Sequence, residues 1–130
     1  MASAGQGLSP RVPNHRRMTD PHADQPVETG GAPLDAADAA AVFVHGRGAR
    51  AAGFLEFARS LGVDDVAYLA PQAARGTWYP DRFVAPVESN EPWLSSALAF
   101  LQRTLDRVTD AGIPLDRLVL GGFSQGGCLA

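Results

Sequence analysis

The sequence contains a single cysteine, and this is the first of several scarcities that narrow the class of protein it can encode. One thiol, Cys128, excludes a disulfide within the chain. No apolar run is long enough to cross a bilayer, and the arginines near the start are not followed by the apolar core of a signal peptide. We therefore expect no stable membrane anchor and a location in the cytoplasm.

Excess positive charge is also lacking, since 11 basic and 14 acidic residues give a net charge of −3. Without a basic surplus, nothing indicates nucleic acid or an anionic membrane as a partner. No group of His, Cys, Asp or Glu has the spacing of a metal-ligand set. We expect no metal and no cofactor, and the composition leaves a homodimer open.

Aromatic residues are missing before Phe43, whereas five of the ten prolines lie within the first 33 residues. A segment of this composition cannot bury enough apolar surface to offset the entropy lost on ordering. We therefore expect residues 1–24 to form a mobile tail, with His15 and His22 solvated in it, and residues 25–130 to form the folded part. Met18 offers an alternative start.

Short apolar runs bounded by Gly and Pro predict four strands. The predicted strands are 25–29, an edge strand broken by Gly30–Pro33, and the core strands 39–44, 66–70 and 118–120. Helical periodicity predicts a helix over 50–61 and a second one from an Asn90 N-cap to Gly112, with Leu94, Leu98, Leu101, Leu105 and Val108 on its buried face. Strands that alternate with helices predict an α/β fold with a mostly parallel sheet and flanking helices.

The loop at 72–92 is long for a compact domain, and it carries Trp78 and three prolines. Loops of this length are usually functional or disordered.

The most informative motif is Gly122-Phe123-Ser124-Gln125-Gly126, a Gly-x-Ser-x-Gly pattern directly after the predicted strand 118–120. In a nucleophile elbow this pattern holds the serine hydroxyl exposed on a sharp strand-to-helix turn, beside backbone N–H groups that receive negative charge. Ser124 is therefore the candidate nucleophile, and the amide of Gln125 is one candidate oxyanion donor.

A second glycine-containing loop, His45-Gly46-Arg47-Gly48, follows the strand 39–44. In hydrolases with a parallel sheet, the second oxyanion donor comes from such a loop after an earlier strand. The amide of Arg47 is the candidate. We interpret His45 as a residue that shapes this loop rather than as a general base.

These two motifs, together with 67–74 and Thr77-Trp78-Tyr79-Pro80, resemble the phospholipase/carboxylesterase family of α/β-hydrolases, which includes acyl-protein thioesterases. The resemblance implies hydrolysis of small-molecule carboxylic esters or thioesters through an acyl-serine at Ser124. It also implies substrate contacts around His45, Gly46, Trp78 and Tyr79.

The family's catalytic triad runs Ser, Asp, His along the chain, and residues 125–130 contain neither Asp nor His. We therefore expect an amino-terminal part of a hydrolase, truncated just after the elbow, with negligible turnover and poor solubility. The alternative is a non-catalytic truncated hydrolase or interaction module.

Dinucleotide binding is a weaker alternative. Residues 46–51 match G-x-G-x-x-A, but Leu69-Ala70-Pro71-Gln72 lacks the carboxylate that would hold the ribose.

Overall fold

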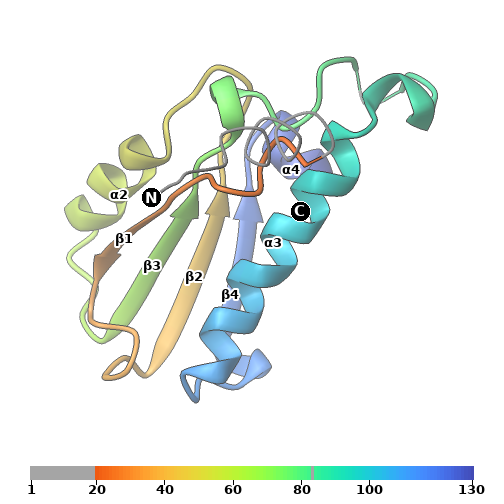
Figure 1. Cartoon of the computed structure of the whole chain (residues 1–130). Coiled ribbons are helices and arrows are strands. Elements are labelled where there is room, and N and C mark those ends of the chain that lie inside the picture. Colours follow the sequence, from red (N-terminus) through yellow and green to blue (C-terminus); the bar gives the residue numbers. More distant parts are fainter. Residues whose placement is uncertain (1–19, 83) are drawn as a thin grey trace, which may run out of the picture.

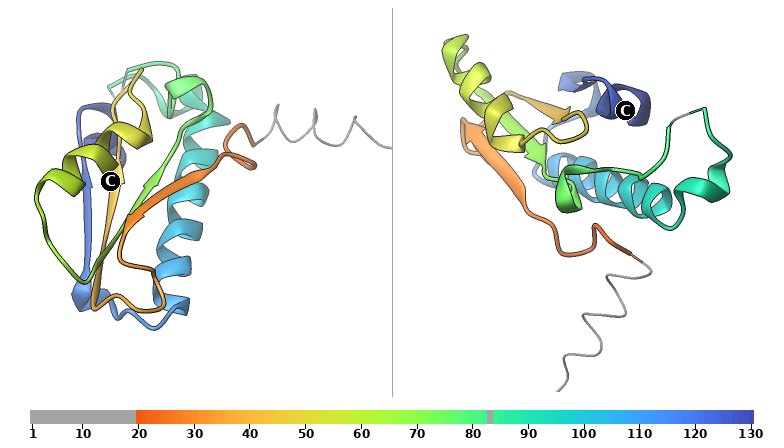
Figure 2. Two further views of the ribbon diagram at one scale, coloured as in Figure 1. Left: turned by 90° about the vertical axis from the view of Figure 1, so that its left-hand side faces the viewer. Right: turned by 90° about the horizontal axis from the view of Figure 1, so that it is seen from above.

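A four-stranded sheet forms the centre of the molecule, with helices on both of its faces (Figures 1 and 2). The computed structural model describes residues 20–82 and 84–130. The strands are β1 (Val27–Gly31), β2 (Ala39–Val44), β3 (Val66–Pro71) and β4 (Leu118–Gly122), in the order β1-β3-β2-β4. The three strands β2, β3 and β4 are parallel, whereas β1 is antiparallel to β3. The predicted α/β class and its mostly parallel sheet are confirmed.

Within residues 20–82 and 84–130, the two long helices are α2 (Ala51–Ser60) and α3 (Trp93–Asp110), which lie on opposite faces of the sheet (Figure 2). A short helix, α4 (Gln125–Leu129), follows β4, and three 3₁₀ turns lie at η1 (Ala74–Gly76), η2 (Val87–Asn90) and η3 (Leu115–Arg117). Among the described residues, no helix has the length and apolar character needed to cross a membrane.

Alternation along β2 explains how the sheet supports both layers. Val42 and Val44 are buried in the clusters that α3 covers, through Val108 and Phe100 respectively. Phe43 points to the other face, where its ring stacks on Phe54 of α2 at 4.2 Å between centroids. Successive side chains of a strand point to opposite faces, so β2 contributes to two cores.

The first strand covers 27–31 and not the predicted 25–29, because Gly30 and Gly31 belong to β1 instead of ending it and residues 25 and 26 precede it. A Cβ on Gly31 would collide with the Val66 carbonyl oxygen and lie 2.6 Å from the Tyr68 ring. Gly31 therefore allows β1 to lie close against β3, whereas the space beside Gly30 is bounded by Leu55 of α2. Neither glycine breaks the strand.

Residues 20–24 correct the prediction of a tail that reaches Asp24. His22 is fully buried, and its backbone N–H donates to the Ser96 hydroxyl at 2.8 Å, while that hydroxyl bonds Asp20. The expectation of a solvated His22 is wrong. Hydrogen bonds to α3 and to the long loop hold this segment in place, although it has few apolar residues to bury. The rest of the predicted tail, including His15 and Met18, lies outside the described residues.

The start and the buried face of α3 also differ from prediction. Pro92 precedes the helix, and the side chain of Asn90 accepts the Asp81 N–H at 2.6 Å, so Asn90 is not its N-cap. The Glu91 carboxylate instead accepts the Ser95 N–H at 2.9 Å. Leu98 is 49% exposed, and the face toward the sheet is formed by Ser96, Ala97, Phe100, Leu101, Thr104 and Val108.

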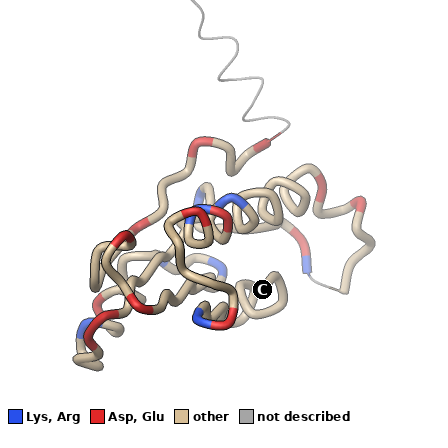
Figure 3. The backbone as a smooth tube through the Cα atoms, turned by 90° about the horizontal axis from the view of Figure 1, so that it is seen from below, with Lys and Arg blue, Asp and Glu red and all other residues tan. Residues whose placement is uncertain are grey.

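The outer edge of β4 is apolar and open. Val119 is 65% exposed, and Phe123, just beyond the strand, is 72% exposed. The strand itself, Leu118–Gly122, contains no Asp, Glu, Lys or Arg that would place a charge on this edge (Figure 3). Such an edge can pair with another chain.

Candidate active site

The carboxyl ends of β2 and β4 meet at one edge of the sheet, and this places the two glycine-containing motifs side by side. The parallel register pairs Val44 with Gly122, so the His45–Gly48 loop and the Gly122–Gly126 turn leave the sheet together. In open α/β sheets, this edge is where ligands bind.

Ser124 stands on a strained turn between β4 and α4. Its φ of 56° and ψ of −120° lie in a region that residues with a side chain seldom adopt. Holding such a conformation costs on the order of 1–3 kcal/mol, which the surrounding structure must supply. The Phe123 N–H bonds the Val44 carbonyl at 3.2 Å, and the Gly126 N–H bonds the Phe123 carbonyl at 3.0 Å.

The spacing of the two motif glycines follows from backbone contacts. A Cβ on Gly122 would lie 2.5 Å from the Gly126 carbonyl oxygen. A Cβ on Gly126 would collide with the carbonyl oxygens of Val44 and His45. Because backbone atoms form both obstacles, the turn can pack against β2 only with glycine at these two positions.

The second loop touches the serine directly. A Cβ on Gly46 would lie 3.3 Å from the Cβ of Ser124 and 3.1 Å from the Phe123 carbonyl oxygen. Among the described residues, neither the Arg47 amide nor the Gln125 amide donates to a protein acceptor. Two amides without a protein partner therefore lie on either side of the Gly46–Ser124 contact.

Both ring nitrogens of His45 are used inside the protein. Nε2 accepts the Ala73 N–H at 3.0 Å, so the proton is on Nδ1, which donates to the Gly46 carbonyl at 2.7 Å. Burial lowers the pKa of His45, which keeps the ring neutral at pH 7. This arrangement agrees with a loop-shaping role, and it leaves no imidazole nitrogen for a substrate.

Trp78 lies in the core rather than on a cavity wall. Its ring is fully buried, and the indole N–H donates to the His45 carbonyl at 2.8 Å. The predicted substrate contact of this side chain has no support in the geometry. Tyr79 does line a cavity, and burial, with Cys128 as a further neighbour, raises the pKa of its hydroxyl.

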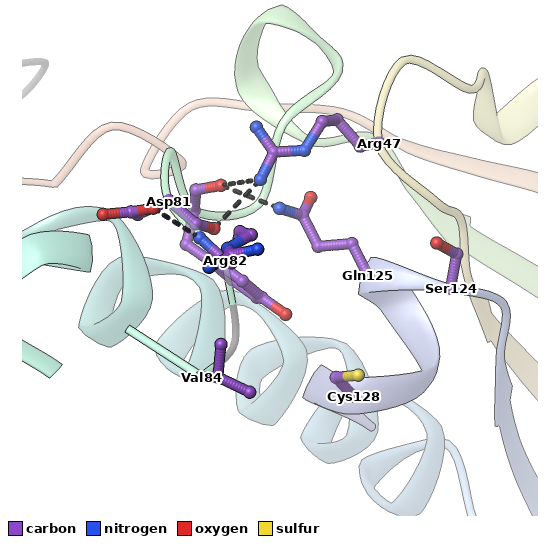
Figure 4. A pocket seen from close by; sticks show the side chains of 8 residues that line it. Arg47, Asp81, Arg82, Val84, Ser124, Gln125 and Cys128 are labelled. Atoms are coloured by element: carbon purple, nitrogen blue, oxygen red, sulfur yellow. Dashed lines mark hydrogen bonds between the residues drawn. The ribbon is translucent and has the colours of Figure 1, made fainter. Parts of the chain in front are cut away.

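A cavity of about 620 Å³ opens beside Ser124, between the elbow and the long loop (Figure 4). Ser124 and Cys128 lie on the elbow side, and the loop faces them. The residues that line the cavity are Arg47, Tyr79, Asp81, Arg82, Val84, Ser124, Gln125 and Cys128. Its size lies within the usual range for small-molecule sites.

A second cavity of similar volume is lined by Gly46 and other residues of the same loop, together with four phenylalanines. Phe43, Phe54, Phe57 and Phe123 line it. Among the described residues, no group of three His, Cys, Asp or Glu could hold a metal ion.

Sequence reasoning named Ser124, Gly46, Arg47 and Gln125, and the structure places these four residues at the same edge of the sheet. It did not name several residues that lie around them. Asp81, Arg82, Val84 and Cys128 line the cavity, and His22 and Asn90 hold the long loop. The loop's length and its aromatic residues were the only signals in the sequence, and they do not identify partners far along the chain.

The chain is similar in sequence to proteins of known function. Acyl-protein thioesterase 1 of Cryptococcus neoformans is 29% identical over 115 residues, covering 75% of this chain and 48% of its own length. The same protein of Yarrowia lipolytica is 30% identical over 105 residues, covering 68% of this chain and 46% of its own length. The chain thus spans about half the length of the curated relatives it matches.

Solved structures that resemble the chain are also matched over about half of their length. A phospholipase/carboxylesterase of Dyadobacter fermentans superimposes with a TM-score of 0.77 at 40% identity, over 82% of this chain and 51% of that one. Zea mays acyl-protein thioesterase 2 shares the fold, with a TM-score of 0.56 at 18% identity, over 78% of this chain and 47% of that one. Residues 31–130 match the family described as Phospholipase/Carboxylesterase, and this chain belongs to that family.

Proposed function

We propose that this chain carries the nucleophile and the oxyanion site of a serine hydrolase that cleaves carboxylic esters or thioesters. The main support is the strained backbone of Ser124, whose φ is 56°, and its position next to the Gly46 loop. A serine in a core helix or on an ordinary turn does not adopt this conformation. Here it exposes the hydroxyl between the loop with the Arg47 amide and the turn with the Gln125 amide.

In the proposed reaction, Ser124 Oγ attacks the acyl carbon, and the carbonyl oxygen gains negative charge. The amides of Arg47 and Gln125 donate to that oxygen, which lowers the barrier to the tetrahedral intermediate. The bond to the alcohol or thiol then breaks and leaves an acyl group on Ser124, which water removes. The open cavity beside Ser124 provides room for one part of the substrate.

Removal of the Ser124 proton needs a base, and neither described imidazole is free to accept it. His45 bonds Ala73 and Gly46, and His22 bonds Ala74 and Trp78. We propose that the 130-residue chain alone acylates slowly and turns over negligibly. A cytoplasmic location and a homodimer stay predictions.

Adduct mapping on this chain tests the proposal. The chain is incubated with a fluorophosphonate probe, and the modified serine is located by peptide mass spectrometry. We expect the adduct at Ser124 in preference to the exposed Ser60 of α2, loss of that adduct in Ser124→Ala, and no change in Ser60→Ala. Modification spread evenly over exposed serines would contradict the proposal.

A further inference from the structure

One backbone carbonyl oxygen is shared by the two residues whose amides flank Ser124. The Tyr79 oxygen accepts from Arg47 Nη2 at 3.2 Å and from Gln125 Nε2 at 2.7 Å (Figure 4). Arg47 follows β2, whereas Gln125 begins α4 after β4. The two sides of the site are therefore tied through a third segment, which belongs to the long loop.

The guanidinium of Arg47 reaches three consecutive carbonyls of this segment. Besides Tyr79, Nη1 donates to the Pro80 oxygen at 3.0 Å and Nη2 to the Asp81 oxygen at 3.0 Å. A planar fork with several donors can make this set of bonds, and a single ammonium cannot. The side chain of Arg47 therefore serves the protein's own backbone.

The carboxamide of Gln125 is used at both of its ends. Its Oε1 accepts the Trp78 N–H at 2.9 Å, while its Nε2 donates to Tyr79. Gln125 is buried, so these bonds are shielded from water and hold their geometry more firmly than exposed ones.

The segment itself is fixed from behind. His22 Nδ1 accepts the Ala74 N–H at 3.1 Å, which places the ring proton on Nε2, and Nε2 donates to the Trp78 carbonyl at 2.9 Å. Asn90 accepts the Asp81 N–H at the other end. Because Arg47 and Gln125 donate to the same Tyr79 oxygen, a change at Arg47 that moves this oxygen also moves the acceptor of Gln125.

We infer that residues 78–81 form a brace that sets the separation of the Arg47 and Gln125 amides through the side chains of those two residues. Arg47 and Gln125 are thus positioning residues by their side chains, in addition to the role of their amides. A catalytic role for this brace rests on the proposed function. The coupling between Arg47 and Gln125 does not depend on that function.

The test is a comparison of three variants of the full chain by ¹H–¹⁵N NMR. Arg47→Lys keeps the charge but loses the fork, and Gln125→Glu keeps the shape but loses the donor to Tyr79. Arg59→Lys, an exposed change on α2, is the matched control. Amide hydrogen exchange at Trp78, whose N–H donates to Gln125, is measured in the same samples.

If the brace couples the two sides, Arg47→Lys shifts the amide resonance of Gln125, and Gln125→Glu shifts that of Arg47. Exchange at Trp78 speeds up by about tenfold in Arg47→Lys, although that variant leaves the carboxamide of Gln125 in place. The control changes neither signal. Arg47 is exposed, so Arg47→Lys keeps the test decisive even if the buried Gln125→Glu fails to fold.

Shifts confined to each variant's own sequence neighbours, with unchanged exchange at Trp78, would overturn the brace. Fluorophosphonate labelling of the same variants separates the two claims. Cross-shifts without any preferred labelling of Ser124 support the brace and contradict the proposed function. If Ser124 is labelled preferentially, Arg47→Lys does not change that labelling and no cross-shifts occur, the proposed function is supported and the brace is contradicted.

Discussion

Gly46 and Ser124 come so close that a methyl group on the glycine would touch the serine's Cβ at 3.3 Å. This contact joins the ends of two parallel strands that are more than 70 residues apart in the chain. One added carbon atom at Gly46 would therefore change the distance between the Gly46 loop and the Ser124 turn.

Gly46→Ala should therefore slow the labelling of Ser124. The added methyl group pushes the loop from the Phe123 carbonyl, at 3.1 Å, and displaces the Arg47 amide. We expect the labelling rate to fall by about tenfold to a hundredfold, as small misplacements at reacting centres do. The measurement is the second-order rate with a fluorophosphonate.

Gly53→Ala is the matched control, because a Cβ on Gly53 in α2 meets nothing within 4 Å. It should leave labelling unchanged and stabilise the helix by about 1 kcal/mol. Equal labelling rates for the two alanine variants would contradict the close contact.

Gly126→Ala should destabilise the fold, because its methyl group meets the carbonyl oxygens of Val44 and His45, which cannot move without breaking the end of β2. We expect a loss of about 3 kcal/mol or more in the free energy of unfolding. Gly127→Ala, whose nearest neighbour would be Gly122 at 3.4 Å, should cost less than about 1 kcal/mol. Urea unfolding of both variants distinguishes the two neighbours, and similar losses would argue against the packing of this turn.

The pairing of the two motifs could be predicted because each has a local signature. An apolar run followed by His45-Gly46 or by Gly122–Gly126 indicates a strand and the turn after it, and parallel strands bring such turns to one edge. The burial of His22 could not be predicted, since its ring partners are the backbones of Ala74 and Trp78, more than 50 residues away. Asn90 was misassigned for a different reason: its side chain bonds the nearby loop backbone at Asp81 and Arg82, and a helix-start signal does not distinguish such a bond from an N-cap.

Stability should fall as the pH drops below about 6.5. Burial lowers the pKa of both His22 and His45, although the Trp78 carbonyl and Asp20 act in the opposite direction on His22. Below the unfolded-state pKa, the unfolded chain binds protons that the folded chain does not, so acid favours unfolding. Each histidine contributes up to about 1.4 kcal/mol per pH unit until its folded pKa is passed.

Urea unfolding between pH 7.5 and 5.0 measures this slope, and His22→Gln should reduce it while leaving the contribution of His45. A free energy of unfolding that stays constant over this range, or an unchanged slope in His22→Gln, would show that these rings are not held neutral.

Val119→Lys should raise the solubility of the chain. Val119 is 65% exposed on β4, at an edge of the sheet, and a charged side chain there disfavours pairing with another chain. Val63→Lys, at a similarly exposed position outside the strands, is the control and should have a smaller effect. Light scattering against protein concentration gives the comparison, and equal effects would assign the aggregation to general hydrophobicity.

The most direct measurement of the central claim is an NMR comparison of the chain before and after Ser124 is phosphonylated. The adduct places a phosphoryl oxygen where the oxyanion would form, so the amide protons of Arg47 and Gln125 should both move downfield as they begin to donate to it. Other amides of the turn should move less. An adduct at Ser124 that leaves either amide unmoved, or no adduct there at all, would contradict the account.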